Sequence, residues 1–519
     1  MKNYILKIYL NGLVVLFITS FVLINCSYSQ NENDVVAEAG VDKITVEDYM
    51  NRYEFMPHLN YSSDNLDTMK KEFLYSLIAE KLWSLEGSQK RYDTLESVRY
   101  SLESLRRLLI RDELYKTEVE PKIKISDEEI KDGLQKVTLE LFVKIISTED
   151  SSEIFRISDQ LIKGADFDSL LSTRKENRLQ ETPVRIVFGS LDDEIVEDLL
   201  FGMEQGSISL PIKSGNGWFI FKLFSKNQNP GVKLSTGQPR NMVMRTLQDR
   251  KAGKVGGAYL DSLLGGRRVE ADGKIFTEIF QSFYSNLSKK YQSILKDSVF
   301  NVTLTEKDII ELLNSLNQAT LNSAFIKFQE NPLTAKDFLY YLYYREIKLD
   351  NLSPDYVKKV LSSTVRQYIE DEMLVREGIK LGLENSRDVV NGVSLWRKHY
   401  MAQLMMESYY DSAKINDADL KDYITTKDKD STTAEEKSAF KTELELYRLQ
   451  KILTEKTIKF ANKYSISINE NILNKITLSE LNTFTYKLIG FGGRIAAFPE
   501  TIPLYEWYYI MKNKKTSLP

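Results

Sequence analysis

The stretch "LIAEKLWSLEG", Leu77 to Gly87, returns without a gap as "YIEDEMLVREG", Tyr368 to Gly378. Both copies carry apolar residues at helical spacing and close on a Glu-Gly pair, which favours a helix that ends at a glycine in the left-handed conformation. A match of this length between distant segments indicates an internal repeat, which constrains the architecture before any local signal does. The chain is therefore expected to contain one helical unit twice.

Three further blocks recur in the same order around this stretch. Their order and nearly constant offset, with repeated helix caps as well as apolar positions, argue against a chance similarity between amphipathic helices. A further helix is predicted after each copy, over 240–264 and 434–464. The matched blocks are "ITVEDYM" (Ile44–Met50) with "LTAKDFL" (Leu333–Leu339), Val98–Leu109 with Val389–Tyr400, and "KISDEEIKD" (Lys124–Asp132) with "KINDADLKD" (Lys414–Asp422).

Composition bounds the class of protein. A chain of 519 residues exceeds a single hydrophobic core, and its 42% hydrophobic and 11% aromatic residues suffice for several. Lys and Arg number 70 against 74 Asp and Glu, so the net charge of -4 lacks the electrostatic footprint of a nucleic-acid binder. We expect a multidomain α+β protein that does not bind nucleic acid.

The first residues have the pattern of a secretory signal peptide. Lys2 and Lys7 precede an apolar run over residues 13–24. This run is shorter than the roughly 20 residues of a membrane-spanning helix. Cys26, the single cysteine, follows in "LINCS", which resembles a bacterial lipobox except at Asn25. Two alternatives stay open: lipid attachment at Cys26, or cleavage after Ser29. No disulfide can form within the chain.

The first copy is interrupted by residues 138–226, whereas the second has only a polar loop at 425–433. The insert is predicted as strand, helix, helix, strand, helix and strand. Within it, "KGADFDSL" (Lys163–Leu170) and "EQGSISLPIKSGNGWFIFKL" (Glu204–Leu223) resemble the parvulin domain of prolyl isomerases. The resemblance implies an active site with two histidines, a cysteine or aspartate, and an apolar pocket for the proline ring.

This chain departs from that pattern at the positions that carry the chemistry. Its only histidines, His58 and His399, lie outside the insert. Phenylalanine stands at both positions where the resemblance implies a histidine. It supplies neither a proton nor a hydrogen bond to an amide whose rotation barrier is about 18–20 kcal/mol, so we expect little or no isomerase activity. In the resemblance the two histidines fall on Phe142 and Phe219, the cysteine or aspartate on Pro183, and the pocket residues on Asp192 and Val196, with Trp218 beside Phe219.

The helical units around the insert resemble those of envelope foldases of the SurA, PrsA and PpiD type. That resemblance implies two SurA-N-like helical chaperone modules, the first carrying an inserted parvulin-like βαααβ-type domain, that hold unfolded exported polypeptides in the periplasm without a cofactor. The alternatives are an active peptidyl-prolyl isomerase and a scaffold with a fixed envelope partner. The expected division is signal peptide 1–29 (or lipoprotein signal to 25), module one 30–137, parvulin-like domain 138–227, closing helix and connector 228–298, module two 299–425, its closing helix 426–475, and an aromatic tail of unknown role 476–519.

The aromatic run "FLYYLYY", Phe338 to Tyr344, opens a helix of the second copy. Aromatic side chains all round a helix indicate either core packing or an adhesive face for another chain. Because the folded part has no cysteine and the chain has only two isolated histidines, Cys-His and zinc sites cannot be assembled, and we expect no metal. The candidate client-binding residues are Tyr340, Tyr341, Tyr343 and Tyr344.

Overall fold

The structure, a computed structural model, describes residues 34–57, 65–173, 182–233, 235–291, 302–343, 345, 347–426, 433–479 and 483–516. The predicted signal peptide with Cys26, together with His58 and Tyr344, lies outside these residues. The chain divides into two compact units. The first unit takes the described parts of 1–99, 394–487 and 495–519, and the second takes those of 100–393 and 488–494.

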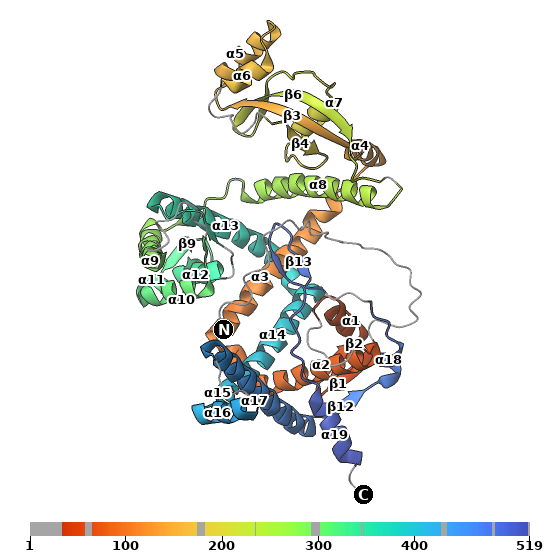
Figure 1. Cartoon of the computed structure of the whole chain (residues 1–519). Helices are drawn as coiled ribbons and strands as arrows, with labels where there is room; N and C mark the ends of the chain where they lie inside the picture. Colours follow the sequence, from red (N-terminus) through yellow and green to blue (C-terminus); the bar gives the residue numbers. More distant parts are fainter. Residues whose placement is uncertain are drawn as a thin grey trace. The chain divides into compact units, whose positions relative to one another are not determined.

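The first unit combines the start of copy one with the end of copy two (Figure 1). Its elements are β1 (Val35–Ala39), β2 (Asp42–Thr45), α1 (Val46–Glu54), α2 (Leu66–Gln89), η1 (Tyr92–Thr94), α15 (Tyr410–Ala413), α16 (Asp417–Thr426), α17 (Ala434–Lys463), β12 (Ile466–Ile468), α18 (Glu470–Lys475) and α19 (Glu506–Thr516). The unit boundaries fall within α3 (Glu96–Glu118), α14 (Arg387–Glu407), β13 (Tyr486–Leu488) and β14 (Arg494–Ala496).

The second unit holds the parvulin-like insert and the start of copy two. Before and through the insert it has η2 (Glu120–Lys122), α4 (Asp127–Val137), β3 (Leu139–Thr148), α5 (Ser151–Ile162), α6 (Phe167–Ser172), β4 (Val184–Val187), α7 (Glu194–Gly202), β5 (Ile212–Ser214) and β6 (Gly217–Gln228). After it come α8 (Gln238–Leu264), β7 (Glu270–Ala271), α9 (Gly273–Tyr291), β8 (Val302–Thr303), α10 (Glu306–Ser315), α11 (Gln318–Asn322), β9 (Ala324–Lys327), β10 (Leu333–Thr334), α12 (Ala335–Tyr343), β11 (Lys348–Leu349), α13 (Pro354–Lys380) and η5 (Leu383–Asn385).

The helix starts that the repeated caps predict are confirmed. In each pair the side chain of the first residue accepts a hydrogen bond from the main-chain N–H of the second, which satisfies a donor that the first helical turn leaves free. The turns η1 and η5 also correspond, because each follows a left-handed residue, Arg91 (φ 59°) or Gly382 (φ 75°). The capping pairs are Thr45/Asp48, Thr334/Asp337, Ser126/Glu129 and Asn416/Asp419.

Each copy's hairpin receives its third strand from the closing segment of the other copy. The hairpin β1–β2 pairs with β12, which follows the closing helix of copy two, and Ala37 lies opposite Ile468. The hairpin β9–β10 pairs with β7, which follows the closing helix of copy one, and Ala271 lies opposite Ile326. The compact units therefore differ from the consecutive modules expected from the sequence, since the copies exchange their closing strands.

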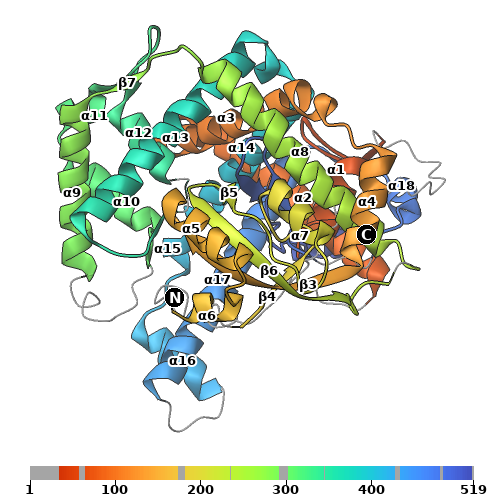
Figure 2. The same ribbon diagram turned by 90° about the horizontal axis from the view of Figure 1, so that it is seen from above.

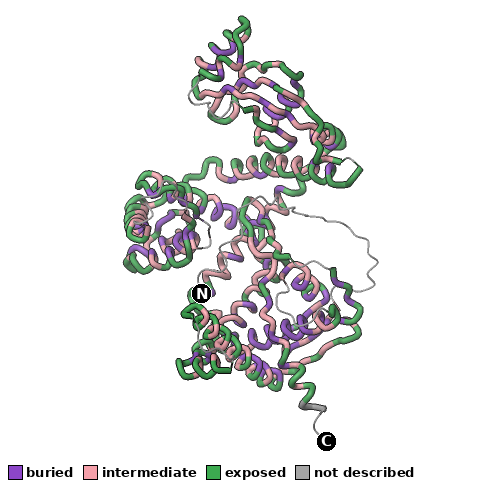
Figure 3. The backbone as a smooth tube through the Cα atoms, viewed as in Figure 1, coloured by how far each residue is buried: buried purple, intermediate pink, exposed green. Residues whose placement is uncertain are grey.

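The closing helices follow the same exchange. The helix α17 packs on α2 in the first unit, and α8 packs on α13 in the second. Most of α2 between Lys70 and Ser84 is buried, so that this helix lies in the core of its unit (Figure 3). A core helix covered on several sides explains why α2 lacks a polar face.

Gly87 and Gly378 lie inside their helices, which corrects the expected left-handed end. A Cβ atom on Gly87 would lie 2.3 Å from the main-chain oxygen of Met401 in α14, and one on Gly378 would lie 2.5 Å from Cγ2 of Ile110 in α3. Met401 and Ile110 occupy corresponding positions of the repeat. The glycines are therefore required for two equivalent helix crossings, each between helices of different copies.

The insert folds as a four-stranded antiparallel sheet in the order β4-β3-β6-β5 (Figures 1 and 2). β3 pairs with β6 from Leu139 opposite Gln228 to Thr148 opposite Trp218. The helices α5 and α6 pack with Ile146 and Ile220 in one core, while α7 and α8 contribute to a second core with Val143 and Leu223. At the base of the domain, α4 lies against α8 (Figure 2).

A helix that crosses a bilayer must be both long enough and apolar enough to span its hydrocarbon core. In the part of the chain that the structure describes, no helix meets both requirements.

The glycine crossings generate a testable expectation. Gly87→Ala should lower the free energy of unfolding by about 1–3 kcal/mol, because the new methyl group meets main-chain atoms of Met401 that cannot move without shifting α14. Gly257→Ala is the matched control, since this glycine of α8 has nothing within 4 Å of its virtual Cβ atom and should gain stability from helix propensity. Urea unfolding followed by circular dichroism measures both. Equal effects of the two variants would contradict the close crossing.

Candidate functional site

A cavity of about 1110 Å³ lies within the second unit, between one face of the parvulin-like sheet, the loop before α7, and α8. This volume is at the upper end for ligand pockets and admits a short polypeptide segment. Its lining residues are Val143, Ile145, Ile186, Gly189, Leu191, Asp192, Asp193, Glu194, Ile195, Val196, Leu200, Ser214, Gly215, Phe219, Phe221, Thr246, Asp249, Arg250, Gly253 and Lys254.

The sheet wall of this cavity is apolar. Phe219 and Phe221 of β6 stack with ring centroids 6.0 Å apart and planes 10° from parallel. Val143 and Ile145 of β3 continue the wall. The side chains of these four residues can bury an apolar ring, and they supply neither a proton nor a hydrogen bond to a twisted amide.

The structure brings together three of the six residues predicted for the degenerate parvulin site: Phe219, Asp192 and Val196. The wall that the sequence assigned to Phe142 is formed instead by Val143 and Ile145, because successive residues of β3 point to opposite faces of the sheet. The other two predicted residues lie elsewhere: Pro183 precedes β4, and Trp218 packs in the opposite core, with its ring 5.3 Å from that of Phe155.

The carboxylate of Asp193 at the rim is used to start a helix. It accepts hydrogen bonds from the Ser214 hydroxyl at 2.6 Å and from the main-chain N–H groups of Ile195 and Val196. The hydrogen bond from Ser214, with those two N–H groups, holds the pKa of Asp193 below its usual range. The carboxylate of Asp193 is therefore ionised at neutral pH, and its oxygens already accept these hydrogen bonds. In this form it has no proton to donate as a general acid.

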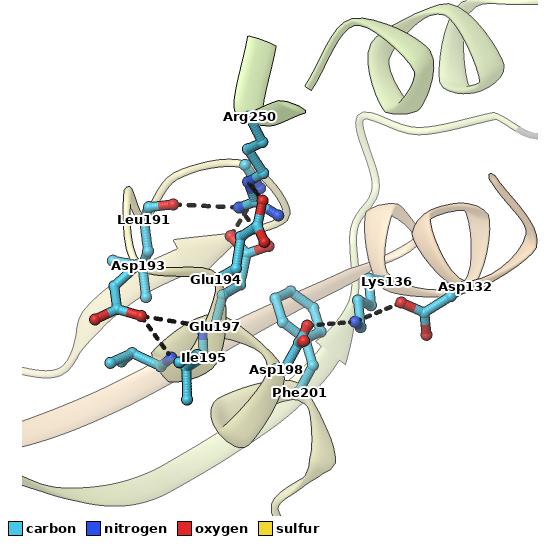
Figure 4. Close-up of polar contacts among 12 residues, drawn as sticks. Asp132, Lys136, Leu191, Asp193, Glu194, Ile195, Glu197, Asp198, Phe201 and Arg250 are labelled. Carbon is cyan, nitrogen blue, oxygen red and sulfur yellow. Dashed lines mark hydrogen bonds and ion pairs between the residues drawn. The ribbon is translucent and has the colours of Figure 1, made fainter. Parts of the chain in front are cut away.

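A buried ion pair closes the cavity on the side of α8 (Figure 4). Glu197 of α7 is fully buried and accepts from Arg250 Nη2 at 2.8 Å and from the Gly189 N–H at 2.9 Å. Arg250 also donates to the Leu191 carbonyl at 3.2 Å and lies over the ring of Phe188. The helix α8 follows the insert in the chain. It is thus held against the insert by an ion pair whose carboxylate, that of Glu197, is fully buried.

Sequence reasoning missed this contribution of α8. Arg250 lies far from Glu197 in the chain, and no spacing rule connects the two. The neighbouring ion pair of Lys254 with Glu194 is more exposed to solvent. Lys136 of α4 forms ion pairs with Asp132 of its own helix and with Asp198 of α7 (Figure 4). Together these pairs hold α7 between α4 and α8.

Loss of the Arg250 charge should loosen the insert. Arg250→Met leaves the Glu197 carboxylate buried without its cation, which costs about 3–5 kcal/mol. Lys254→Met is the matched control, because the Lys254 side chain is 68% exposed and its pair with Glu194 should contribute less than about 1 kcal/mol. Hydrogen exchange of the β3 and β6 amides, measured by mass spectrometry, should accelerate only in the first variant. Unchanged exchange in both would contradict the ion pair.

The tyrosines of α12 lie in two different environments. Tyr341 is largely buried and donates to Asp371 Oδ2 at 2.8 Å, and burial, with the charge of Asp371, raises its pKa well above its usual value. Tyr343 is half-buried against the core of the second unit. Tyr340 stacks on Tyr100 of α3 with ring centroids 3.6 Å apart. Of the described three, Tyr340 and Tyr341 line a second cavity.

The one described histidine lies beside a buried ion pair. His399 is buried in the first unit with Nδ1 3.6 Å from Glu80 Oε2, a carboxylate that already pairs with Arg52 at 2.7 Å. Among the described residues, no group of three or more His, Cys, Asp or Glu is placed to hold a metal ion.

Comparison with known families identifies the insert. Residues 125–233 match the family model described as "PPIC-type PPIASE domain". The chain carries a parvulin-type domain. The matched segment begins next to α4 and ends after β6, so it contains the whole sheet, whereas the α8 wall of the cavity lies beyond it. It covers about a fifth of the 519 residues, and it leaves the helical parts of both units unmatched.

Solved structures similar to the chain are PrsA foldases of low identity. The peptidylprolyl isomerase PrsA of Bacillus cereus is 18% identical, with 47% of this chain and 96% of that chain covered and a TM-score of 0.21. The foldase protein PrsA of Streptococcus pneumoniae is 14% identical, with 44% and 93% covered and a TM-score of 0.21. TM-scores this low support no conclusion about the whole chain. No curated protein matches it.

Proposed function

We propose that this protein is an exported holding chaperone whose parvulin domain binds polypeptide without isomerising prolyl bonds. Export is inferred from the signal-peptide pattern of residues 1–29, and periplasmic location is a further part of the proposal, with either a lipid on Cys26 or cleavage after Ser29. The clients are unfolded or partly folded exported polypeptides, and no cofactor is needed, because weak apolar contacts can hold such chains reversibly.

The observation that carries the proposal is the chemistry of the parvulin cavity. The domain keeps a large space with an apolar wall, but Phe219 stands where the resemblance implies a histidine, and the insert contains no histidine at all. Asp193 and Glu197, acids that line or border the cavity, are engaged in a helix cap and an ion pair. The site can thus bury a proline or aromatic ring while leaving the amide without catalytic partners.

Isomerase activity provides the first test. The protein should not accelerate refolding of a proline-limited substrate such as RNase T1 in an assay without protease, because Phe219 offers no polar group to the twisted amide. The PPIC-type match favours the opposite outcome. An acceleration that rises linearly with protein concentration and is lost in Phe219→Ala would show that the domain is an active isomerase. A known parvulin serves as the positive control.

Holding of unfolded chains provides the second test. The protein should suppress aggregation of chemically denatured citrate synthase at near-stoichiometric ratio, and a version lacking 139–228 should suppress it more weakly, because it lacks the parvulin cavity. The deletion is geometrically mild, because the ends of the insert already meet where the Asn229 N–H donates to the Thr138 carbonyl at 2.7 Å. Light scattering measures suppression.

Absence of suppression by the complete protein would contradict the chaperone proposal. The alternative, a scaffold for a fixed envelope partner, predicts a single stoichiometric complex after affinity capture, whereas a holding chaperone predicts many substoichiometric clients.

A further inference from the structure

A second cavity, of about 180 Å³, opens in the second unit where α3 meets α12 and α13. Its walls come from both copies of the repeat, since α3 belongs to copy one and the other two helices to copy two. A volume well below the roughly 300–1,000 Å³ of small-molecule pockets suits one side chain better than a cofactor. Its lining residues include Tyr100, Ser104, Tyr340, Tyr341, Tyr368 and Asp371.

Two stacked pairs of tyrosine rings form the apolar surface of this pocket. Tyr100 and Tyr340 stack with centroids 3.6 Å apart and planes 11° from parallel, and Tyr341 and Tyr368 stack at 4.3 Å and 30°. Stacked, hydrogen-bonded rings lose little entropy when a further ring or aliphatic group packs on them. The pocket is therefore preorganised for a large apolar side chain.

The charges in the pocket compensate one another. Asp371 accepts from Arg111 Nη1 at 2.8 Å and from the Tyr341 hydroxyl at 2.8 Å, and it also pairs with Arg345. Glu372 pairs with Arg107 and with Arg376. Because each carboxylate has cationic partners, the pocket favours neither a cationic nor an anionic ligand.

The chain itself shows what the corresponding carboxylate does in the first unit. Glu80, which corresponds to Asp371, binds Arg52 through both of its oxygens at 2.7 and 2.8 Å. Although burial alone would raise the pKa of Glu80, the arginine holds it well below the usual range. The same Arg52 donates to the Pro499 carbonyl at 3.1 Å and to the Thr501 hydroxyl at 2.8 Å.

The tail crosses α1 and α2 without regular structure from Pro499 to Tyr505, and α19 continues it. The Leu504 N–H donates to Ser76 Oγ at 3.0 Å, and Trp507 Nε1 donates to the Tyr75 carbonyl at 3.2 Å, with the rings of Tyr508 and Tyr75 stacked 3.9 Å apart. In the second unit, Arg111 on Asp371 likewise donates to the carbonyls of Phe491 and Gly492. In both units, then, an arginine held by the buried acid binds main-chain carbonyls.

We propose that the tyrosine pocket binds an extended segment of a non-native polypeptide, which inserts one aromatic or large aliphatic side chain between the two ring pairs. Arg345, whose side chain is 26% exposed, bonds the main chain of the bound segment, as Arg52 and Arg111 bond the tail. The inference rests on the proposed chaperone function and assigns a binding site to it outside the parvulin domain. Tyr341 positions Asp371 rather than contacting the client with its hydroxyl.

Filling the pocket tests this site. Ser104→Phe places a ring into the cavity and should weaken binding of fluorescein-labelled, reduced and carboxymethylated α-lactalbumin roughly tenfold by fluorescence anisotropy. Ser363→Phe, the same change at an exposed position of α13 that does not line the pocket, should leave the affinity unchanged. Tyr340→Ala removes one stacked ring and should also weaken binding. Thermal unfolding of each variant shows whether it folds.

The outcomes separate the two proposals. If the unaltered protein does not bind the unfolded probe, the chaperone function itself fails. If it binds, and folded Ser104→Phe and Tyr340→Ala variants bind with unchanged affinity, the pocket is not a client site. Loss of self-association in Ser104→Phe, measured by sedimentation, would instead assign the pocket to a second copy of this chain and overturn the proposal.

Discussion

The exchange of closing strands is the constraint on which the described structure depends. A two-stranded hairpin is at best marginally stable in water, and each hairpin here gains its third strand from the opposite half of the chain: β1–β2 from β12, and β9–β10 from β7. The exchange brings α17 onto α2 and α8 onto α13. Neither half can complete its own sheet, so the halves fold as one interdependent chain, although each has a full set of repeated elements.

The exchange also explains why particular residues recur with altered roles. Gly87 and Gly378 both permit a helix to cross closely over a helix of the other copy. Glu80 and Asp371 both pair with an arginine, which comes from α1 in one unit and from α3 in the other. An isolated buried carboxylate is costly, so the acid is retained only where a cation accompanies it. The arginines in turn bind the tail, which gives residues 490–501 a structural role.

In the proposed function, the parvulin domain keeps its binding space without isomerase chemistry. The matched segment contains the sheet, and α8, which follows it, completes the larger core and the cavity. Phe219 and Phe221 make the wall adhesive, and the pair of Glu197 with Arg250 secures α8 to the domain. Function depends on the site rather than on the fold. A domain of this kind can add a binding surface to a protein whose other surfaces are helical.

The sequence by itself determined the repeat, the helix starts and the order of elements in the insert. These depend on local chemistry: Thr45 with Asp48 and Ser126 with Glu129 cap helices through neighbours three residues away, and alternation reveals strands such as β6. Only the tertiary structure decided which partner each element meets. Strands of two or three residues, such as β7 and β12, carry no pattern that names a partner. In the sequence, Gly87 resembles a glycine at a helix end. In the structure a side chain is excluded there because the main chain of Met401, more than three hundred residues away in the chain, packs against it. Val143 and Ile145, rather than Phe142, line the cavity, because the pairing of β3 with β6 decides which alternate residues of β3 share a face with Phe221.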